Sequence, residues 1–599
     1  MPKTKMRRQC EAALRNIFSC ENLILCISVF FNALLFLAAV SRNPPSWYTN
    51  DDFRMMTIVS GAYSGTPSPD IVFMRYPMGL LLSGLYSVTT AVPWYGLFTM
   101  LCMFVPSCVF CYYITVKAYR KNRIVLGVLL YLMLFVFFIQ KYICLPQFTL
   151  TSAFLGVGAL ALLHEMPDKN NAVHIILAVL FAALSFSVRS KAFYLILPAI
   201  LWVIAVRVFM DKKGKVKYVL WSVFTLILCL AVLITDMAAW RRPEYAEFKE
   251  FKEVRAEVYD YGSVPGYYEN MPFYKGNGIS EVTYRAISGR FLDVDETVNT
   301  ENLTLISAYM KSIRSTEKSV SKRILSAFRN GLARWYYSSD QTIKYSAIFA
   351  TVLFFVCIAM SVKKRKAELI YPFIAVGMIL EITFLEFNGR IMARLIDLMM
   401  LTMLVCGILA VTELIDKRTV TLGYYADRFK EDKVKSVCFC GLLCAAFIFA
   451  AVGICNMQED LDSKSLALRQ TTNSKLEALM SYTEKYPDNF FFYDTNDFIS
   501  STSYVFKTYE KGRVLNNESM GSWNSHSPLY YERNRKFGFE TAIEGLTSTE
   551  VEVYFITTTP PKMGISKTLK DVYNKKLTEV DKIQTAKDIL YVYMVIDDE

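Results

Sequence analysis

Eleven long apolar runs constrain what this chain of 599 residues can fold into. A helix of about 20 apolar residues crosses the hydrocarbon core of a bilayer, and each run is close to that length. Hydrophobic residues make up 53% of the chain and charged residues 20%, so it lacks the polar shell of a large soluble protein. A soluble enzyme, a disordered protein and a fibrous protein are therefore excluded. The runs lie at 23–41, 95–116, 124–140, 147–164, 172–187, 191–209, 218–238, 343–362, 369–387, 392–412 and 436–455.

The distribution of Lys and Arg orients these spans. Cytoplasmic loops of membrane proteins are enriched in both residues, and five of them precede the first run. With eleven spans and a cytoplasmic N-terminus, 24 basic residues fall on the cytoplasmic side. The apolar stretch 77–92 is short, and counting it as a twelfth span would place most of these charges outside. We therefore expect eleven spans, with 77–92 as a helix along the membrane interface.

This topology divides the chain into three parts. Residues 1–412 form a membrane module, whose largest external loops are 42–94 and 239–342. Residues 413–455 comprise a basic cytoplasmic loop and the last span. Residues 456–599 form a small extracytoplasmic domain that we expect to be α/β, with a helix near 463–485 and strands near 489–494, 551–557 and 589–596. The predicted fold class is thus a polytopic α-helical membrane protein with an α/β C-terminal domain.

Charge and composition narrow the chemistry further. The net charge of +12 is accounted for by the cytoplasmic loops, because 456–599 holds 17 basic and 22 acidic residues, so nucleic acid is not an expected partner. The 14 cysteines show no paired CxxC motifs, and the three histidines offer little for a His-based metal site or a Ser-His-Asp triad. Two DxD-like stretches, at Asp293 and at Asp494, are interpreted as solvated loops. Nucleotide-binding glycine motifs are absent from the sequence.

An acidic pair, Asp51 and Asp52, lies in the first external loop about ten residues after the first span. The pattern that follows predicts a short helix over 52–63, broken by the glycines and prolines after it. The pair would then be held at the outer membrane surface. On its own, the pair is better explained by helix capping from Asn50 or Asp51.

Several basic residues lie on the external side, against the topology rule. Arg189 and Lys191 lie between the fifth and sixth spans, and Arg390 and Arg394 between the ninth and tenth, while Arg75 is in the first loop. Charge at membrane depth is costly, so such residues are usually retained for a ligand. A lipid phosphate suits them, because a guanidinium grips phosphate with two parallel hydrogen bonds. The alternative is that they snorkel to the headgroups.

Together these features resemble the integral-membrane C-type glycosyltransferases. The acidic pair in YTNDDF, the interfacial segment YPMGL and the basic turn VRSK match that superfamily's pattern. More narrowly, NDDF, SGAYSGTPSPD and GLLLSGLY are similar to a group of bacterial glucosyltransferase-like membrane proteins. The chain lacks the histidine before the proline and the Asp-Glu order of the protein mannosyltransferases. The resemblance covers roughly residues 1–412.

The resemblance implies a transferase of the bacterial plasma membrane. It would move a sugar from a polyprenyl-phosphate donor to an extracytoplasmic glycan, lipid or protein, with inversion. Asp51 or Asp52 would act as the general base, and Arg75, Arg189, Lys191, Arg390 and Arg394 would bind the lipid phosphate. No cofactor is certain, and a divalent metal ion on the two aspartates is left open. Two other classes also remain open: a flippase for lipid-linked glycans, and a non-catalytic scaffold of a cell-envelope assembly.

Overall fold

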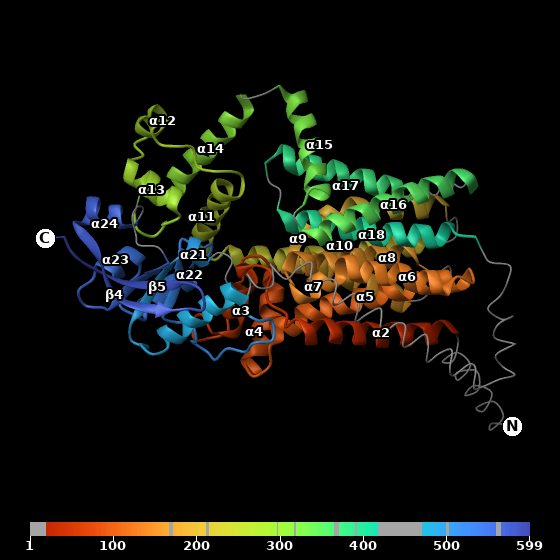
Figure 1. Ribbon diagram of the computed structural model, residues 1–599, viewed down its shortest axis with the longest axis horizontal. Helices are drawn as coiled ribbons and strands as arrows, with labels where there is room; N and C mark the ends of the chain where they lie inside the picture. Colours follow the sequence, from red (N-terminus) through yellow and green to blue (C-terminus); the bar gives the residue numbers. More distant parts are fainter. Residues whose placement is uncertain are drawn as a thin grey trace.

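The protein consists of a helical bundle with a mixed α/β layer at one end, which we call the domain end (Figure 1). A helical layer formed by residues between 243 and 316 lies beside that α/β layer. The computed structural model describes residues 20–166, 172–210, 215–295, 297–316, 319–338, 340–364, 370–389, 392–416, 470–498, 502–558 and 565–598. The predicted fold class, a polytopic helical membrane protein with a small C-terminal sheet domain, is confirmed.

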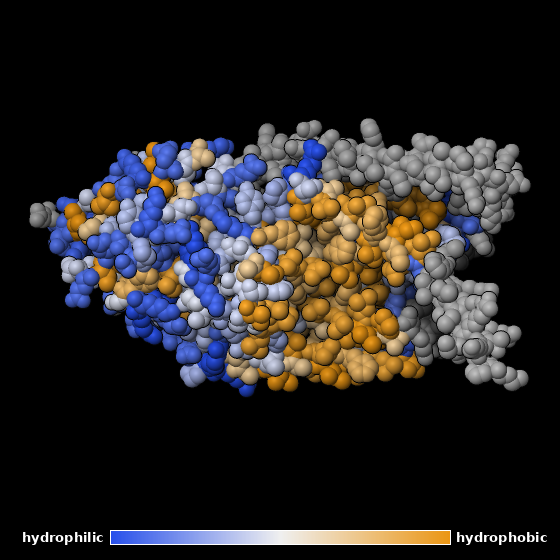
Figure 2. All heavy atoms as spheres, turned by 90° about the horizontal axis from the view of Figure 1, so that it is seen from below, coloured by the Kyte–Doolittle hydropathy of each residue, from blue (hydrophilic) through white to orange (hydrophobic). Residues whose placement is uncertain are grey.

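Seven helical segments are long and apolar enough to cross a membrane. Figure 2 shows one face of the molecule, where hydrophobic side chains gather over the bundle and hydrophilic ones over the domain end. Two further predicted spans form the shorter helices α8 (Phe148–His164) and α17 (Ile370–Phe387), whereas 436–455 lies outside the described residues. The seven segments are α2 (Cys20–Arg42), α5 (Trp94–Arg120), α6–η1–α7 (Ile124–Leu134, Phe135–Ile139, Gln140–Cys144), α9 (Ala172–Met210), α10 (Lys215–Trp240), α16 (Gln341–Lys364) and α18 (Ala393–Leu414).

Helix α9 contains two predicted spans and folds back on itself. Arg189 has extended backbone angles (φ −156°, ψ 90°) and interrupts the helix. Both halves then pack along α8, because Gly156 of α8 lies against Ser185 of the first half and Ile196 of the second. A side chain at Gly156 would collide with Ile196, so the glycine permits this close approach. The turn brings Arg189 to the domain end of the bundle.

The ambiguous stretch 77–92 forms the short helix α4 (Tyr76–Val88). Its 13 residues extend about 20 Å, which is too short to cross a bilayer. Leu80, Leu81 and Val88 are exposed, while Met78 and Leu82 pack inward. The length of α4, and its packing with one face buried and the other exposed, agree with the prediction that this stretch does not add a twelfth span.

Residues between α10 and α16 form a layer of helices beside the C-terminal domain (Figure 1). One hydrophobic cluster includes Phe251, Ile287 and Leu303 from this layer together with Phe492 and Phe555 from the C-terminal sheet, so the two regions share a core. The layer contains α11 (Pro243–Asp260), α12 (Met271–Gly276), α13 (Glu281–Gly289) and α14 (Thr300–Thr316), and α15 (Val320–Tyr336) leads back to the bundle.

The C-terminal domain contains a five-stranded sheet in the order β2-β1-β3-β5-β4. β1 is parallel to β2 and β3, whereas β5 is antiparallel to β3 and β4. The three predicted strands are confirmed as β1 (Phe490–Asp494), β3 (Val553–Thr557) and β5 (Ile589–Asp597). The sequence did not predict β2 (Asn517–Met520) and β4 (Lys575–Gln584). The helices of the domain are residues 470–483, α21 (Thr495–Phe498), α22 (Pro528–Arg535), α23 (Ala542–Thr547) and α24 (Ile565–Tyr573).

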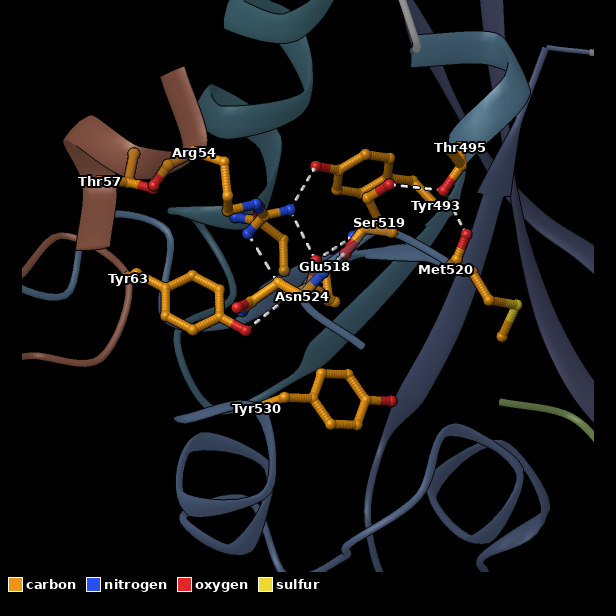
Figure 3. Close-up of polar contacts among 12 residues, drawn as sticks. Arg54, Thr57, Tyr63, Tyr493, Thr495, Glu518, Ser519, Met520, Asn524 and Tyr530 are labelled. Atoms are coloured by element: carbon orange, nitrogen blue, oxygen red, sulfur yellow. Dashed lines mark hydrogen bonds and ion pairs between the residues drawn. The ribbon is translucent and has the colours of Figure 1, made fainter. Parts of the chain in front are cut away.

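A buried charge network attaches this domain to α3 (Asn50–Ser60) of the first external loop (Figure 3). The Glu518 carboxylate of β2 lies 2.6 Å from the Arg54 guanidinium of α3 and 2.7 Å from that of Arg533. Tyr63 donates a further hydrogen bond of 2.7 Å to Glu518. Glu518 and Arg533 are fully buried, and Tyr493 of β1 lies 3.5 Å from Arg54. One carboxylate is therefore shared by two guanidinium groups, one of them fully buried and the other largely buried.

Backbone hydrogen bonds extend this junction on both sides of α3. The amides of Gly512 and Val514 donate to the carbonyls of Gly61 and Ala62, at 2.9 and 3.0 Å. Before α3, the amide of Trp47 donates to Ser503 at 3.1 Å. The chain on both sides of α3 is thus bonded to the C-terminal domain.

Replacing Glu518 with Gln should detach the domain from α3. The substitution keeps the size of the side chain but leaves two buried arginines with no countercharge, which costs about 3–5 kcal/mol of stability. Thermal unfolding and limited proteolysis of the purified protein measure this loss. Glu532→Gln, at an exposed position of α22, is the matched control and should leave both unchanged. Equal stability of the two variants would contradict the assignment.

Candidate functional site

Helix α3 holds the two aspartates at the domain end of the bundle. It begins one residue before the pair, and nine of its eleven residues are buried. The predicted helix over 52–63 ends earlier in the structure, because Gly61 adopts a left-handed conformation (φ 79°). A side chain at Gly61 would lie 2.7 Å from the Pro67 nitrogen, so glycine is required there. The helix is short and enclosed, and its first turn has a fixed position.

Asp52 is completely buried and fully hydrogen-bonded. Its carboxylate accepts hydrogen bonds from the Tyr95 hydroxyl (3.0 Å), the Phe148 amide (3.1 Å) and the Thr49 hydroxyl (3.2 Å). The Phe148 amide is at the N-terminus of α8, where a helix favours negative charge. Burial, reinforced by the neighbouring charge of Asp51, nevertheless raises the pKa of Asp52 from 3.8 to about 8. These contacts give Asp52 a positioning role between three elements.

Asp51 points toward positive charge. Its side chain is 14% exposed, and its carboxylate lies 3.4 Å from the Arg394 guanidinium at the start of α18. Burial raises the pKa of Asp51, whereas the charges of Arg394 and Arg189 act in the opposite direction. Of the predicted pair, Asp51 is therefore the carboxylate placed beside the predicted phosphate-binding arginines.

Aromatic rings pack against the guanidinium groups of Arg189 and Arg394. Phe73 stacks on Phe148, with ring centroids 5.5 Å apart and planes at 11°. The Arg189 guanidinium lies over both rings, at 5.2 and 5.1 Å, and Arg394 lies 5.9 Å from the Phe148 ring. Trp523 of the C-terminal domain meets the Phe73 ring edge-on at 4.9 Å. Arg189 is thus held by cation–π contacts, and the domain contributes a ring to the site.

Arg75 has a different environment from Arg189. Its guanidinium lies 2.5 Å from the Asp236 carboxylate of α10 and donates a hydrogen bond of 2.9 Å to the Ser190 hydroxyl. The Tyr76 amide also donates to Asp236, at 2.8 Å. The charge of Arg75 is therefore compensated within the protein, and its contacts fasten the first loop to α10 and to the turn of α9.

The remaining predicted cations differ in position. Lys191 is exposed, two residues after Arg189, and Arg390 lies outside the described residues. Lys252 of α11 was not predicted from the sequence. Burial, together with the charges of Arg189, Lys191 and Lys249, lowers the pKa of Lys252 to about 8 although Glu253 opposes the shift. A sequence signal for Lys252 was weak, because it lies among many charges in the long loop 239–342.

The DxD-like stretch at Asp293 is not a solvated loop, contrary to the interpretation from the sequence. Asp293 is 5% exposed, and its carboxylate lies 2.9 Å from the imidazole of His526 and accepts from the Gly521 amide at 3.3 Å. These contacts fix both ends of the segment that carries Trp523. Burial lowers the pKa of His526, but the ion pair with Asp293 outweighs it and the net shift is upward.

The donor set does not fit a metal ion shared by Asp51 and Asp52. Three hydrogen-bond donors occupy the Asp52 carboxylate, and the guanidinium of Arg394 faces Asp51. Among the described residues, ligand-type side chains cluster at the opposite end of the bundle, as His164, Glu165 and Glu413. There the Lys117 ammonium lies 2.5 and 2.7 Å from the two glutamates, so a lysine already supplies the positive charge.

Comparison with solved structures found a likeness in fold. No protein-family model and no curated protein matches the sequence. The fold is similar to that of ArnT from Cupriavidus metallidurans, in a crystal structure bound to undecaprenyl phosphate (TM-score 0.39, 9% identity) and in one of the apo state (TM-score 0.39, 11% identity). Each match covers 96% of this chain and 98% of the other.

The buried Asp52 makes stability depend on pH. Because its pKa is raised to about 8, the folded protein keeps a proton that the unfolded chain loses near 3.8. The stability gained from this proton is complete below the unfolded pKa and is lost as the pH rises through the folded value. Asp52→Asn should therefore remove a fall in stability between about pH 4 and pH 8. Thermal unfolding across this range, for the variant and the parent, measures the difference, and parallel profiles would contradict the assignment.

Proposed function

We propose that the protein is a membrane glycosyltransferase that moves a sugar from a polyprenyl-phosphate donor to an acceptor at the domain end. The observation that most supports this proposal is that the Asp51 carboxylate lies next to the Arg394 guanidinium, with Arg189 nearby. These residues lie where the bundle meets the C-terminal domain. A carboxylate and fixed cations are the two elements that sugar transfer from a phosphate requires. The sequence resemblance to C-type glycosyltransferases supports the same reaction class.

In the proposed reaction, Asp51 removes the proton from an acceptor hydroxyl as that oxygen attacks the anomeric carbon. The bond between this carbon and the phosphate oxygen breaks through an oxocarbenium-like state, and the electron pair stays on the lipid phosphate. Arg189 and Arg394 stabilise this developing charge, and fixed cations are effective because they need no reorganisation. The carboxylate and the phosphate lie on opposite sides of the anomeric carbon in this scheme, which implies inversion.

The environment of Asp51 suits a general base. A carboxylate of ordinary pKa is a weak base at neutral pH, and burial raises the pKa of Asp51. Asp52 is less suited, because its oxygens already accept three hydrogen bonds. We therefore assign the base to Asp51 and the positioning of its helix to Asp52. Lys252 and Lys191 would add positive charge on the approach of the phosphate.

Asp51→Asn should lower sugar transfer by about 10²–10⁴-fold, the usual contribution of a general base. Membranes containing the variant, supplied with a radiolabelled polyprenyl-phosphate sugar, provide the measurement, with polyprenyl phosphates carrying different sugars as candidate donors. Asp52→Asn is the matched control, since it conserves the hydrogen-bond acceptor and should keep most of the rate. Full activity of Asp51→Asn would refute the assignment of the base.

Arg189→Gln and Arg75→Gln should separate phosphate binding from structural support. Arg189→Gln removes a cation assigned to the phosphate, so kcat/KM for the donor should fall by about 10²-fold or more. Arg75→Gln leaves Asp236 without its ion pair, so the melting temperature should fall while the remaining folded protein keeps its donor KM. Donor kinetics and thermal unfolding of both variants test this. An unchanged kcat/KM in Arg189→Gln would contradict the role of Arg189.

A further inference from the structure

Helix α15 combines a wide apolar face with a basic one. Its sequence, VSKRILSAFRNGLARWY, contains four basic residues and no acidic residue. In helical projection the apolar residues occupy about half of the circumference, and the basic residues occupy the other half. This is the pattern of a helix that lies along a membrane surface. In the topology expected from the sequence, this charge lies on the external side, where fewer basic residues are expected.

Part of the apolar face packs on the bundle. Ala327, Gly331 and Trp335 form a buried stripe, and Gly331 approaches Ile382 of α17 so closely that an added side-chain carbon would lie 2.5 Å away. Arg334 forms an ion pair of 3.1 Å with Glu386 at the end of α17. These contacts fix the helix against α17 and set which of its faces points outward.

The adjoining apolar stripe of α15 is exposed. Ile324, Leu325 and Phe328 are 49%, 69% and 41% exposed. The neighbouring α17 exposes Leu380 and Phe384, at 62% and 66%, so the stripe continues the apolar surface of the bundle. In Figure 1, α15 runs across the direction of the long helices at the domain end of the bundle. An amphipathic helix with this orientation is suited to lie along the boundary between hydrocarbon core and headgroups.

We propose that α15 is an interfacial helix that binds anionic phospholipid headgroups in the membrane leaflet at the domain end. Leu325 and Phe328 insert into the boundary of the acyl chains, and the exposed Lys322 and Arg329 contact the headgroup phosphates. Arg323 packs its guanidinium on the Phe387 ring at 4.4 Å and reinforces the attachment to α17. The lack of any acidic residue on α15 favours an anionic lipid over a zwitterionic one.

This inference is independent of the proposed reaction. The residues of α15 differ from those assigned to the sugar donor, and lipid contact can be measured without sugar transfer. The alternative is that a protein partner covers the exposed face of α15. Continuity of this face with the apolar surface of α17 favours lipid. The experiment below separates the two, because a helix that binds protein would remain outside the bilayer.

Depth of insertion can be measured with a tryptophan at position 328. The full-length Phe328→Trp protein, reconstituted in nanodiscs, should lose fluorescence when the phosphatidylcholine is brominated. Tyr268→Trp, at a 67% exposed position beside α12, is the matched control and should not. Both fluorescence changes are taken relative to the parent protein, which corrects for the native tryptophans. Equal responses at 268 and 328 would overturn the placement of α15.

Charge selectivity is tested in the Phe328→Trp protein with brominated phosphatidylglycerol against brominated phosphatidylcholine at equal mole fractions. Quenching should be stronger with the anionic lipid, and K322Q and R329Q should each lower the lipid preference by about fivefold. Quenching by phosphatidylcholine should persist, because the apolar stripe is unchanged. K275Q and K485Q, at exposed positions outside α15, each remove one positive charge as well and serve as the controls; they should leave the lipid preference unchanged. Equal quenching by both lipids before neutralisation would refute the anionic preference.

Discussion

The placement of the candidate site depends on a single buried carboxylate, Glu518. It forms ion pairs with Arg54 from the first external loop and with Arg533 from its own domain, and all three side chains are largely or fully buried. Removing two guanidinium groups from water is costly, so the network is stable only while every member is present. The two ion pairs of Glu518 therefore hold α3 against the C-terminal domain. Asp51 is one helical turn from Arg54, and its position follows from that arrangement.

The partner of each cation at the domain end limits what that cation can do. Arg75 is committed to Asp236, and its role is to hold the first loop. Arg189 rests on the rings of Phe73 and Phe148, which orient its guanidinium by cation–π contacts. Two arginines at the same end of the bundle are therefore held in place by different interactions, one by a carboxylate and the other by aromatic rings.

The apolar runs of the sequence predicted the membrane spans well. The sequence did not predict which residues of the candidate site have a structural role and which face the cations. Spans are local features, and hydrophobic length alone identifies them even where Arg189 turns the chain within α9. The distinction between Asp51 and Asp52 depends on contacts made at long range, such as Tyr95 and Phe148 around Asp52. Glu518 is 464 residues from Arg54, and its polar strand NESM shows no alternation that would indicate a strand. Lys252 and Trp523 enter the site from regions whose sequence carries no local signal of this role.

The two aspartates illustrate how adjacent identical residues acquire different chemistry. Both lose water on folding, which raises the pKa of each. At Asp52 the lost water is replaced by neutral hydrogen-bond donors, so the carboxyl group is enclosed and can exchange little with a ligand. At Asp51 it is replaced by the charges of Arg394 and Arg189, which favour the ionised form and leave the side chain partly exposed. Of the two positions, only Asp51 combines a raised pKa with a partly exposed side chain, which are the properties that the proposed base needs. The fixed hydrogen bonds of Asp52 are then what keeps Asp51 in place, because the two residues share one turn of a short helix.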